Sequence, residues 1–100
     1  IRRTDNFDSF RTSLEAYNSK HVKSVCGIEA KQLSEAARLY AKATPASIVW
    51  GTGLTQHAGG ADGVRALINL AMLTGHVGHS GGLYALEKGN NDCGACDMGA

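Results

Sequence analysis

Residues 51–57, Gly-Thr-Gly-Leu-Thr-Gln-His, combine small and polar side chains directly after a short apolar run. Glycine lets a ligand approach the backbone, and Thr52, Gln56 and His57 supply hydroxyl, amide and imidazole groups that bind polar ligands. If the apolar run is a strand, the stretch lies at its carboxyl end, where open α/β sheets bind ligands. It is no dinucleotide fingerprint, because Gln56 stands where a third glycine is required. A ligand-binding turn and a flexible turn with incidental polar residues both remain open.

Two residue pairs have the spacing of metal ligands, His76 with His79 and Cys93 with Cys96. Zn²⁺ accepts neutral imidazole and thiolate, and both pairs lie in predicted loops that could bend around an ion. In the usual zinc finger, however, the cysteines come first and the histidines lie on a helix. The alternative, two solvated histidines and two small packed cysteines, is therefore favoured on spacing alone.

A third polar cluster consists of Asn90 and Asn91 between Gly89 and Gly94. Its short side chains and backbone offer many hydrogen-bond donors and acceptors, which suits a ligand with many polar groups. Gly-Asn-Asn is also ordinary turn chemistry, so a purely structural role is the alternative.

Hydrophobic periodicity predicts the elements that position these clusters. The predicted helices span residues 7–17, 29–43 and 61–74, and the predicted strands span residues 47–50 and 83–86. The expected elements are thus three helices and one or two short strands, of which the strand at residues 47–50 is expected to be buried.

The predicted elements have candidate start and stop signals. Asp5 and Asn6 are candidate caps of the first helix, and a polar break at residues 18–20 ends it. Pro45 stops the second helix, and Gly75 is expected to end the third as its C′ residue. The third helix is apolar nearly all round, so we expect it to be buried on several sides by sequence outside this chain.

Composition excludes some partners and suggests a location. The 100 residues carry 10 basic and 9 acidic side chains, which is no electrostatic footprint for nucleic acid or an anionic membrane. No apolar run approaches the roughly 20 residues that span a bilayer, so direct membrane insertion is not expected. Three cysteines, an odd number, favour a reducing compartment, and we expect a cytoplasmic location, with the periplasm as the alternative for the parent protein. The first residue is not Met, and we expect the chain to be a fragment.

Several stretches together resemble the catalytic subunit of the molybdopterin oxidoreductases, and most of all its formate dehydrogenase branch. The matching stretches are residues 49–57 (VWGTGLTQH), 64–67 (VRAL), 69–75 (NLAMLTG) and 94–100 (GACDMGA). The resemblance implies part of a Rossmann-like α/β domain that holds bis(molybdopterin guanine dinucleotide) with Mo or W. Its implied parts are a helical hairpin at residues 4–45, a strand–loop–helix unit at 46–75 and a cofactor and substrate loop at 76–100.

The resemblance also implies roles for single residues. The implied cofactor-binding residues are Gly51, Thr52, Gly53, Gln56, His57 and Asn91. No protein ligand of the metal is implied in this segment, because the family's Cys or selenocysteine ligand and its iron–sulfur cysteines lie elsewhere in the parent chain. Cys96 matches a family position that is not a ligand, and Cys93 is an addition.

The substrate loop departs from the formate dehydrogenase pattern, Arg-Gly-Gln-Asn-Asn, whose Arg is thought to orient formate. The loop here is one residue shorter, and two alignments are open. A gap at residues 81–82 puts Glu87 in place of the Arg, which argues against an anionic substrate. A gap after Asn91 aligns residues 88–90 with Arg-Gly-Gln and keeps a cation and an amide, so charge favours Lys88 and Asn90 as catalytic residues, although Lys lacks the bidentate fork of Arg.

The function implied by the resemblance is two-electron oxidation of a small substrate such as formate. Electrons would pass through iron–sulfur clusters to electron-transfer subunits, while the protein supplies positioning and electrostatics. The segment alone is expected to be inactive. One alternative within the family is the large iron–sulfur subunit of NADH-quinone oxidoreductase. The other is a small zinc-binding interaction module built on His76, His79, Cys93 and Cys96.

Overall fold

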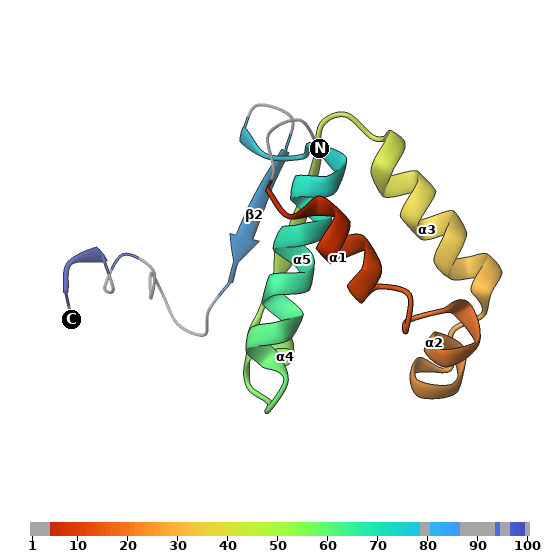
Figure 1. The fold of residues 1–100 in the computed structure, drawn as a ribbon. Coiled ribbons are helices and arrows are strands. Elements are labelled where there is room, and N and C mark those ends of the chain that lie inside the picture. Colours follow the sequence, from red (N-terminus) through yellow and green to blue (C-terminus); the bar gives the residue numbers. More distant parts are fainter. Residues whose placement is uncertain (1–4, 79–80, 87–93, 95–96, 100) are drawn as a thin grey trace. The chain divides into compact units, whose positions relative to one another are not determined.

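The computed structural model describes residues 5–78, 81–86, 94 and 97–99. The chain forms two compact units, Ile1–Ala43 and Thr44–Ala100, and each unit is described by itself. The first unit is helical, and the second contains both helices and strands (Figure 1).

The first unit contains α1 (Phe7–Ser13), α2 (Ser19–Cys26) and α3 (Ala30–Lys42). Helix α1 ends earlier than predicted, because the chain continues in tighter turns in which the Tyr17 N–H donates to the Leu14 carbonyl (3.0 Å). The candidate cap Asn6 does occupy the N-cap position, but in a left-handed conformation with φ 59° and without a side-chain cap hydrogen bond. The expected capping interaction of Asn6 is therefore wrong.

Helix α2 replaces the break that the sequence predicted at residues 18–20. Asn18 is its N-cap, and the Asn18 side chain accepts a hydrogen bond from the His21 N–H (2.9 Å). Gly27 ends the helix with φ 71°, a left-handed conformation that glycine adopts readily. The polar residues that looked like a helix stop are thus the start of another helix. Helix α3 agrees with the predicted range to within one residue at each end.

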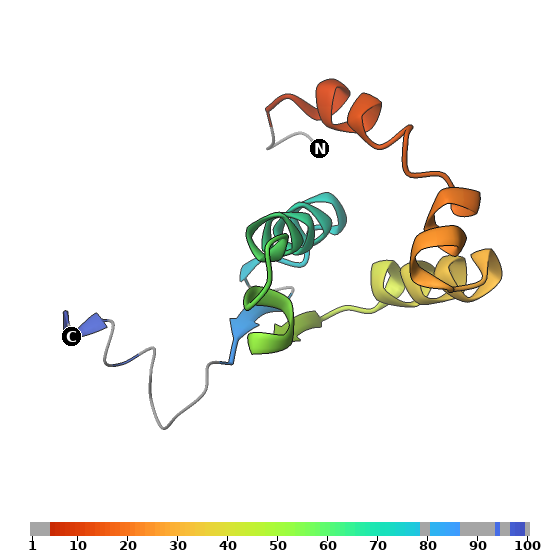
Figure 2. The same ribbon diagram turned by 90° about the horizontal axis from the view of Figure 1, so that it is seen from below.

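The second unit contains β1 (Ala46–Trp50), α4 (Thr52–Thr55), α5 (Gly60–Thr74) and β2 (Gly81–Ala85). The two strands pair in parallel, with Ala46 opposite Gly81 and Trp50 opposite Ala85. A parallel pair needs a crossover, which α5 provides, and α5 lies along one face of the sheet (Figure 2). The α/β class is therefore confirmed. Gly75 ends α5 with φ 77°, as its sequence position indicated.

Close backbone packing explains one glycine of β2. A Cβ atom at Gly81 would overlap the Ala46 carbonyl group of β1 and lie 3.2 Å from the His76 Cβ atom. The start of the parallel pair therefore requires a residue without a side chain at this position.

Burial in the described part of the chain is slight. Ala71 on α5 is its only buried hydrophobic residue, at 0% exposure. Other large apolar residues of α5 remain 36–42% exposed, namely Ile68, Leu70, Met72 and Leu73. Among the described residues, α4 and β2 contact α5, and the expectation that sequence outside this chain buries the helix on several sides stays a prediction. Among the same residues, none of the helices has both the length and the apolar character needed to cross a membrane.

Candidate functional site

The carboxyl ends of both strands lie at one edge of the sheet, where Gly51 follows β1 and Leu86 follows β2. The Leu86 N–H donates to the Trp50 carbonyl (2.7 Å) and extends the pairing to this edge. The predicted ligand-binding turn, residues 51–57, starts here. The fold thus brings the turn to the edge at which open α/β sheets bind ligands.

The turn contains a short helix where the sequence indicated a loop. Gly51 is the N-cap of α4, and the Gln56 N–H donates to the Thr52 carbonyl (2.9 Å). Thr52 is the first residue of α4, and Gln56 is its C-cap with φ −89° and ψ 48°. Thr52 is half-buried and Gln56 is exposed. A hydroxyl and an amide thus lie at the two ends of this short helix.

The two glycines of the turn differ in their surroundings. A Cβ at Gly53 would meet no atom within 4 Å, whereas a Cβ at Gly51 would lie 3.1 Å from the Leu86 carbonyl oxygen. Gly51 is thus tight against the end of β2, and Gly53 has open space beside its backbone. No packing contact in the described part of the chain requires a glycine at position 53. A glycine beside open space is consistent with a site where a ligand approaches the backbone.

His57 follows α4 and is exposed. The Gly59 N–H donates to His57 Nδ1 (3.1 Å), so Nδ1 acts as an acceptor. In the neutral imidazole the other nitrogen, Nε2, then carries the proton and is a hydrogen-bond donor. The turn therefore offers a second side-chain donor, His57 Nε2, in addition to the Gln56 amide.

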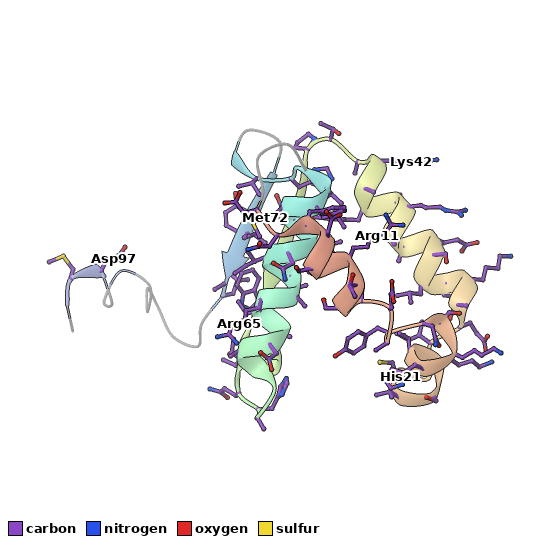
Figure 3. All side chains as sticks on the ribbon, in the orientation of Figure 1. Arg11, His21, Lys42, Arg65, Met72 and Asp97 are labelled. Atoms are coloured by element: carbon purple, nitrogen blue, oxygen red, sulfur yellow. The ribbon has the colours of Figure 1, made fainter. Side chains whose placement is uncertain are left out.

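The charged side chains between residues 51 and 65 are Asp62 and Arg65, both on α5. They pair with each other (Arg65 Nη1 to Asp62 Oδ1, 3.0 Å) and are strongly exposed (Arg65 is labelled in Figure 3). Positive and negative charge thus cancel locally. Recognition at this turn would depend on hydrogen-bonding dipoles and close backbone approach, with little contribution from net charge.

Most of the other predicted site residues cannot be placed relative to this turn. Lys88, Asn90 and Asn91 lie outside the described residues, as do Glu87, His79, Cys93 and Cys96. Their predicted roles remain predictions.

His76 is described, and it is not the solvated loop residue that one interpretation expected. It is 3% exposed, directly after α5, and its N–H donates to the Ala71 carbonyl (2.9 Å). It lies close to Gly81, at the amino end of β2, and so at the edge opposite residues 51–57. No group of three or more potential metal ligands occurs among the residues that the structure describes.

Sequence reasoning missed Gly60, a buried residue at the start of α5. A Cβ there would lie 2.9 Å from the Thr55 carbonyl carbon and 3.0 Å from the Thr55 Cα. Gly60 therefore lets the backbones of α4 and α5 touch. The Gly59-Gly60 pair directly before a predicted helix was the available signal.

Comparison with known proteins identifies relatives along nearly the whole chain. No protein-family model matches it. The chain is 43% identical over 99 residues to formate dehydrogenase H of Escherichia coli, covering 98% of this chain and 14% of that protein. It is 40% identical over 99 residues to the F420-dependent formate dehydrogenase subunit alpha of Methanocaldococcus jannaschii, covering 98% of this chain and 15% of the relative. A putative formate dehydrogenase of Bacillus subtilis, YrhE, is 33% identical over 94 residues, 93% of this chain and 10% of the relative.

The chain is an α/β segment, and these relatives match it along nearly its whole length. The chain belongs to the molybdopterin oxidoreductase family, and within it to a segment that formate dehydrogenase subunits share. The family inferred from the sequence is thereby confirmed. These relatives favour neither the NADH-quinone oxidoreductase alternative nor the zinc module. The chain spans 10–15% of the length of the three relatives.

Proposed function

We propose that the chain is part of the catalytic subunit of a formate dehydrogenase that uses a molybdenum or tungsten pterin cofactor, bis(molybdopterin guanine dinucleotide). The observation that carries this proposal is 43% identity to a formate dehydrogenase over 98% of the chain. The position of residues 51–57 at the carboxyl edge of a parallel βαβ unit supports it independently, because this edge is a common cofactor site.

The reaction converts formate into carbon dioxide, a proton and two electrons. The bound cofactor supplies the redox chemistry, and iron–sulfur clusters elsewhere in the parent chain and electron-transfer subunits would carry the electrons away. The turn supplies position. Thr52 and Gln56 offer a hydroxyl and an amide at the two ends of α4, and His57 offers a donor at Nε2. Open space at Gly53 allows close approach to the backbone.

Lys88 and Asn90 are proposed to act on the substrate, and Asn91 to contact the cofactor. A cation beside formate is favourable by Coulomb attraction, and an amide can donate to a carboxylate oxygen. In the competing alignment Glu87 takes this position, and its carboxylate would repel formate. Charge therefore supports Lys88 over Glu87. We also propose a cytoplasmic location for the parent protein, because cysteines without a disulfide spacing pattern, as in this segment, are typical of a reducing compartment.

Metal and pterin analysis of the purified full-length protein tests the proposal. We expect Mo or W together with a pterin, and formate-dependent reduction of an artificial electron acceptor. One zinc per chain without pterin would contradict the proposal and favour the zinc module. If the protein contains pterin and Mo or W but does not oxidise formate, the cofactor assignment stands and the proposed substrate is wrong.

Substitution at Lys88 tests the substrate loop within the same protein. Lys88→Ala should raise the KM for formate about tenfold or more, because a hydrogen bond to a charged group contributes about 1.5–3 kcal/mol. Lys88→Arg should retain most of the affinity. Lys42→Ala is the matched control, since Lys42 lies in the last turn of α3, in the other unit. An unchanged KM in Lys88→Ala would favour the alignment that uses Glu87.

A further inference from the structure

The contact between α4 and α5 is backbone against backbone at Gly60. A Cβ at this residue would lie 2.9 Å from the Thr55 carbonyl carbon, still closer to its oxygen, and 3.0 Å from its Cα. These are main-chain atoms, so no rotation of a side chain can relieve the overlap. The φ angle of Gly60 lies outside the left-handed region, so its backbone conformation does not require glycine. Glycine is therefore required here for space.

Gly63, one turn further along α5, provides an internal comparison. A Cβ at Gly63 would lie 2.8 Å from Leu54 Cδ1, the far end of a flexible side chain. Leu54 can move away by changing its rotamer. The two glycines therefore meet the same short helix, but only Gly60 restrains its backbone.

The restrained backbone belongs to the turn that carries the candidate site. Thr55 precedes Gln56, whose N–H donates to the Thr52 carbonyl (2.9 Å). Gly60 is also tied to the turn by its own N–H, which donates to the His57 carbonyl (2.9 Å). A shift of Thr55 would therefore move the polar residues on both sides of it.

We infer that Gly60 is a positioning residue: its missing side chain lets α5 hold α4 where Thr52 and Gln56 meet the cofactor. This inference rests on the proposed function. To reach ordinary contacts of at least 3.4 Å, the Thr55 carbonyl carbon would have to move by about 0.5 Å, and the carbonyl oxygen, which lies closer, by more. Misplacements of about 1 Å in positioning groups cost about 100-fold. A loss of about tenfold in cofactor affinity is therefore expected for Gly60→Ala.

The test compares Gly60→Ala and Gly63→Ala in the full-length protein. Pterin and metal content per chain are measured after purification and after dialysis, together with the absorption spectrum of the bound cofactor. Gly60→Ala should lose cofactor about tenfold faster and alter the spectrum of what remains. Gly63→Ala should keep wild-type content and spectrum. Equal retention and identical spectra in both variants would overturn the inference.

A second measurement keeps the inference testable if Gly60→Ala does not fold. Hydrogen exchange of the wild-type protein without cofactor should show the Gln56 amide already protected, because the contact at Gly60 orders the turn in advance. Protection at Gln56 that develops only with cofactor would mean that the ligand orders the turn, and would overturn the inference. Absence of pterin and of Mo or W from the wild-type protein would instead contradict the proposed function.

Discussion

Replacing Gly53 by alanine separates ligand contact from packing within the chain. A Cβ at Gly53 meets no atom within 4 Å, so the substitution creates no clash in the protein itself. Gly53 lies inside α4, where alanine is the better helix former, and the free energy of unfolding should rise by about 0.4–1 kcal/mol. If the cofactor occupies the open space, the added methyl group causes overpacking of about 1–3 kcal/mol. Cofactor affinity should then fall roughly 5- to 150-fold.

Gly51→Ala should behave in the opposite way. Its Cβ would lie 3.1 Å from the Leu86 carbonyl oxygen, so the end of β2 must move by a few tenths of an ångström. A cost of about 1 kcal/mol would lower protection of the Leu86 amide, which donates to the Trp50 carbonyl, about fivefold.

Both variants are assayed in the full-length protein by equilibrium dialysis of the cofactor and by hydrogen exchange. Full cofactor affinity in Gly53→Ala would refute the assignment of this space to the ligand. Cofactor loss in Gly51→Ala with unchanged Leu86 protection would show that the ligand approaches Gly51 instead.

Three further substitutions test single interactions in the full-length protein. Asn18→Ala removes the cap hydrogen bond from the His21 N–H and should destabilise α2 by about 1 kcal/mol, measured as faster amide exchange in that helix. Gly81→Ala should disrupt the start of the parallel pair, because a Cβ would overlap the Ala46 carbonyl group, and the yield of soluble protein should fall sharply. His57→Ala should weaken cofactor binding about fivefold, because a lost hydrogen bond costs about 1 kcal/mol. The midpoint of thermal unfolding of the purified protein should change little, because the His57 side chain is exposed.

The elements that the sequence predicted well are those with strong local signals. The strand at residues 47–50 and the helix at 61–74 have β-branched or apolar runs bounded by Pro45 and glycines, and both were correct to within one residue. Helix α2 was missed because its hydrophobic residues are few, although Asn18 and Gly27 mark its two ends. Val22, Val25 and Cys26 do have helical spacing, but the polar residues before them were interpreted as a break and not as the start of a helix.

The sequence predicted where the candidate site lies, but not which of its glycines are required by close backbone contacts. Glycine and polar residues after a strand predicted a turn at the carboxyl edge, and the parallel pairing of β1 with β2 puts it there. The sequence could not distinguish Gly51 from Gly53, since the difference depends on Leu86, 35 positions along the chain from Gly51. The Gly59-Gly60 pair was a sequence signal, but the reason that Gly60 is required comes from the path of the Thr55 backbone, which the sequence does not give.

The uncovered face of the sheet explains why these tests need the full-length protein. Val49 and Tyr84 are opposite each other in the register and 56% and 54% exposed. Parallel sheets are normally covered on both faces, and a two-stranded sheet is marginal in water by itself. The strands that position the turn therefore depend on polypeptide beyond the described residues. The contact between Gly60 and Thr55 does not, because it is made within six consecutive residues. The local shape of the turn can thus be set by its own sequence, while its place at the sheet edge needs the larger protein.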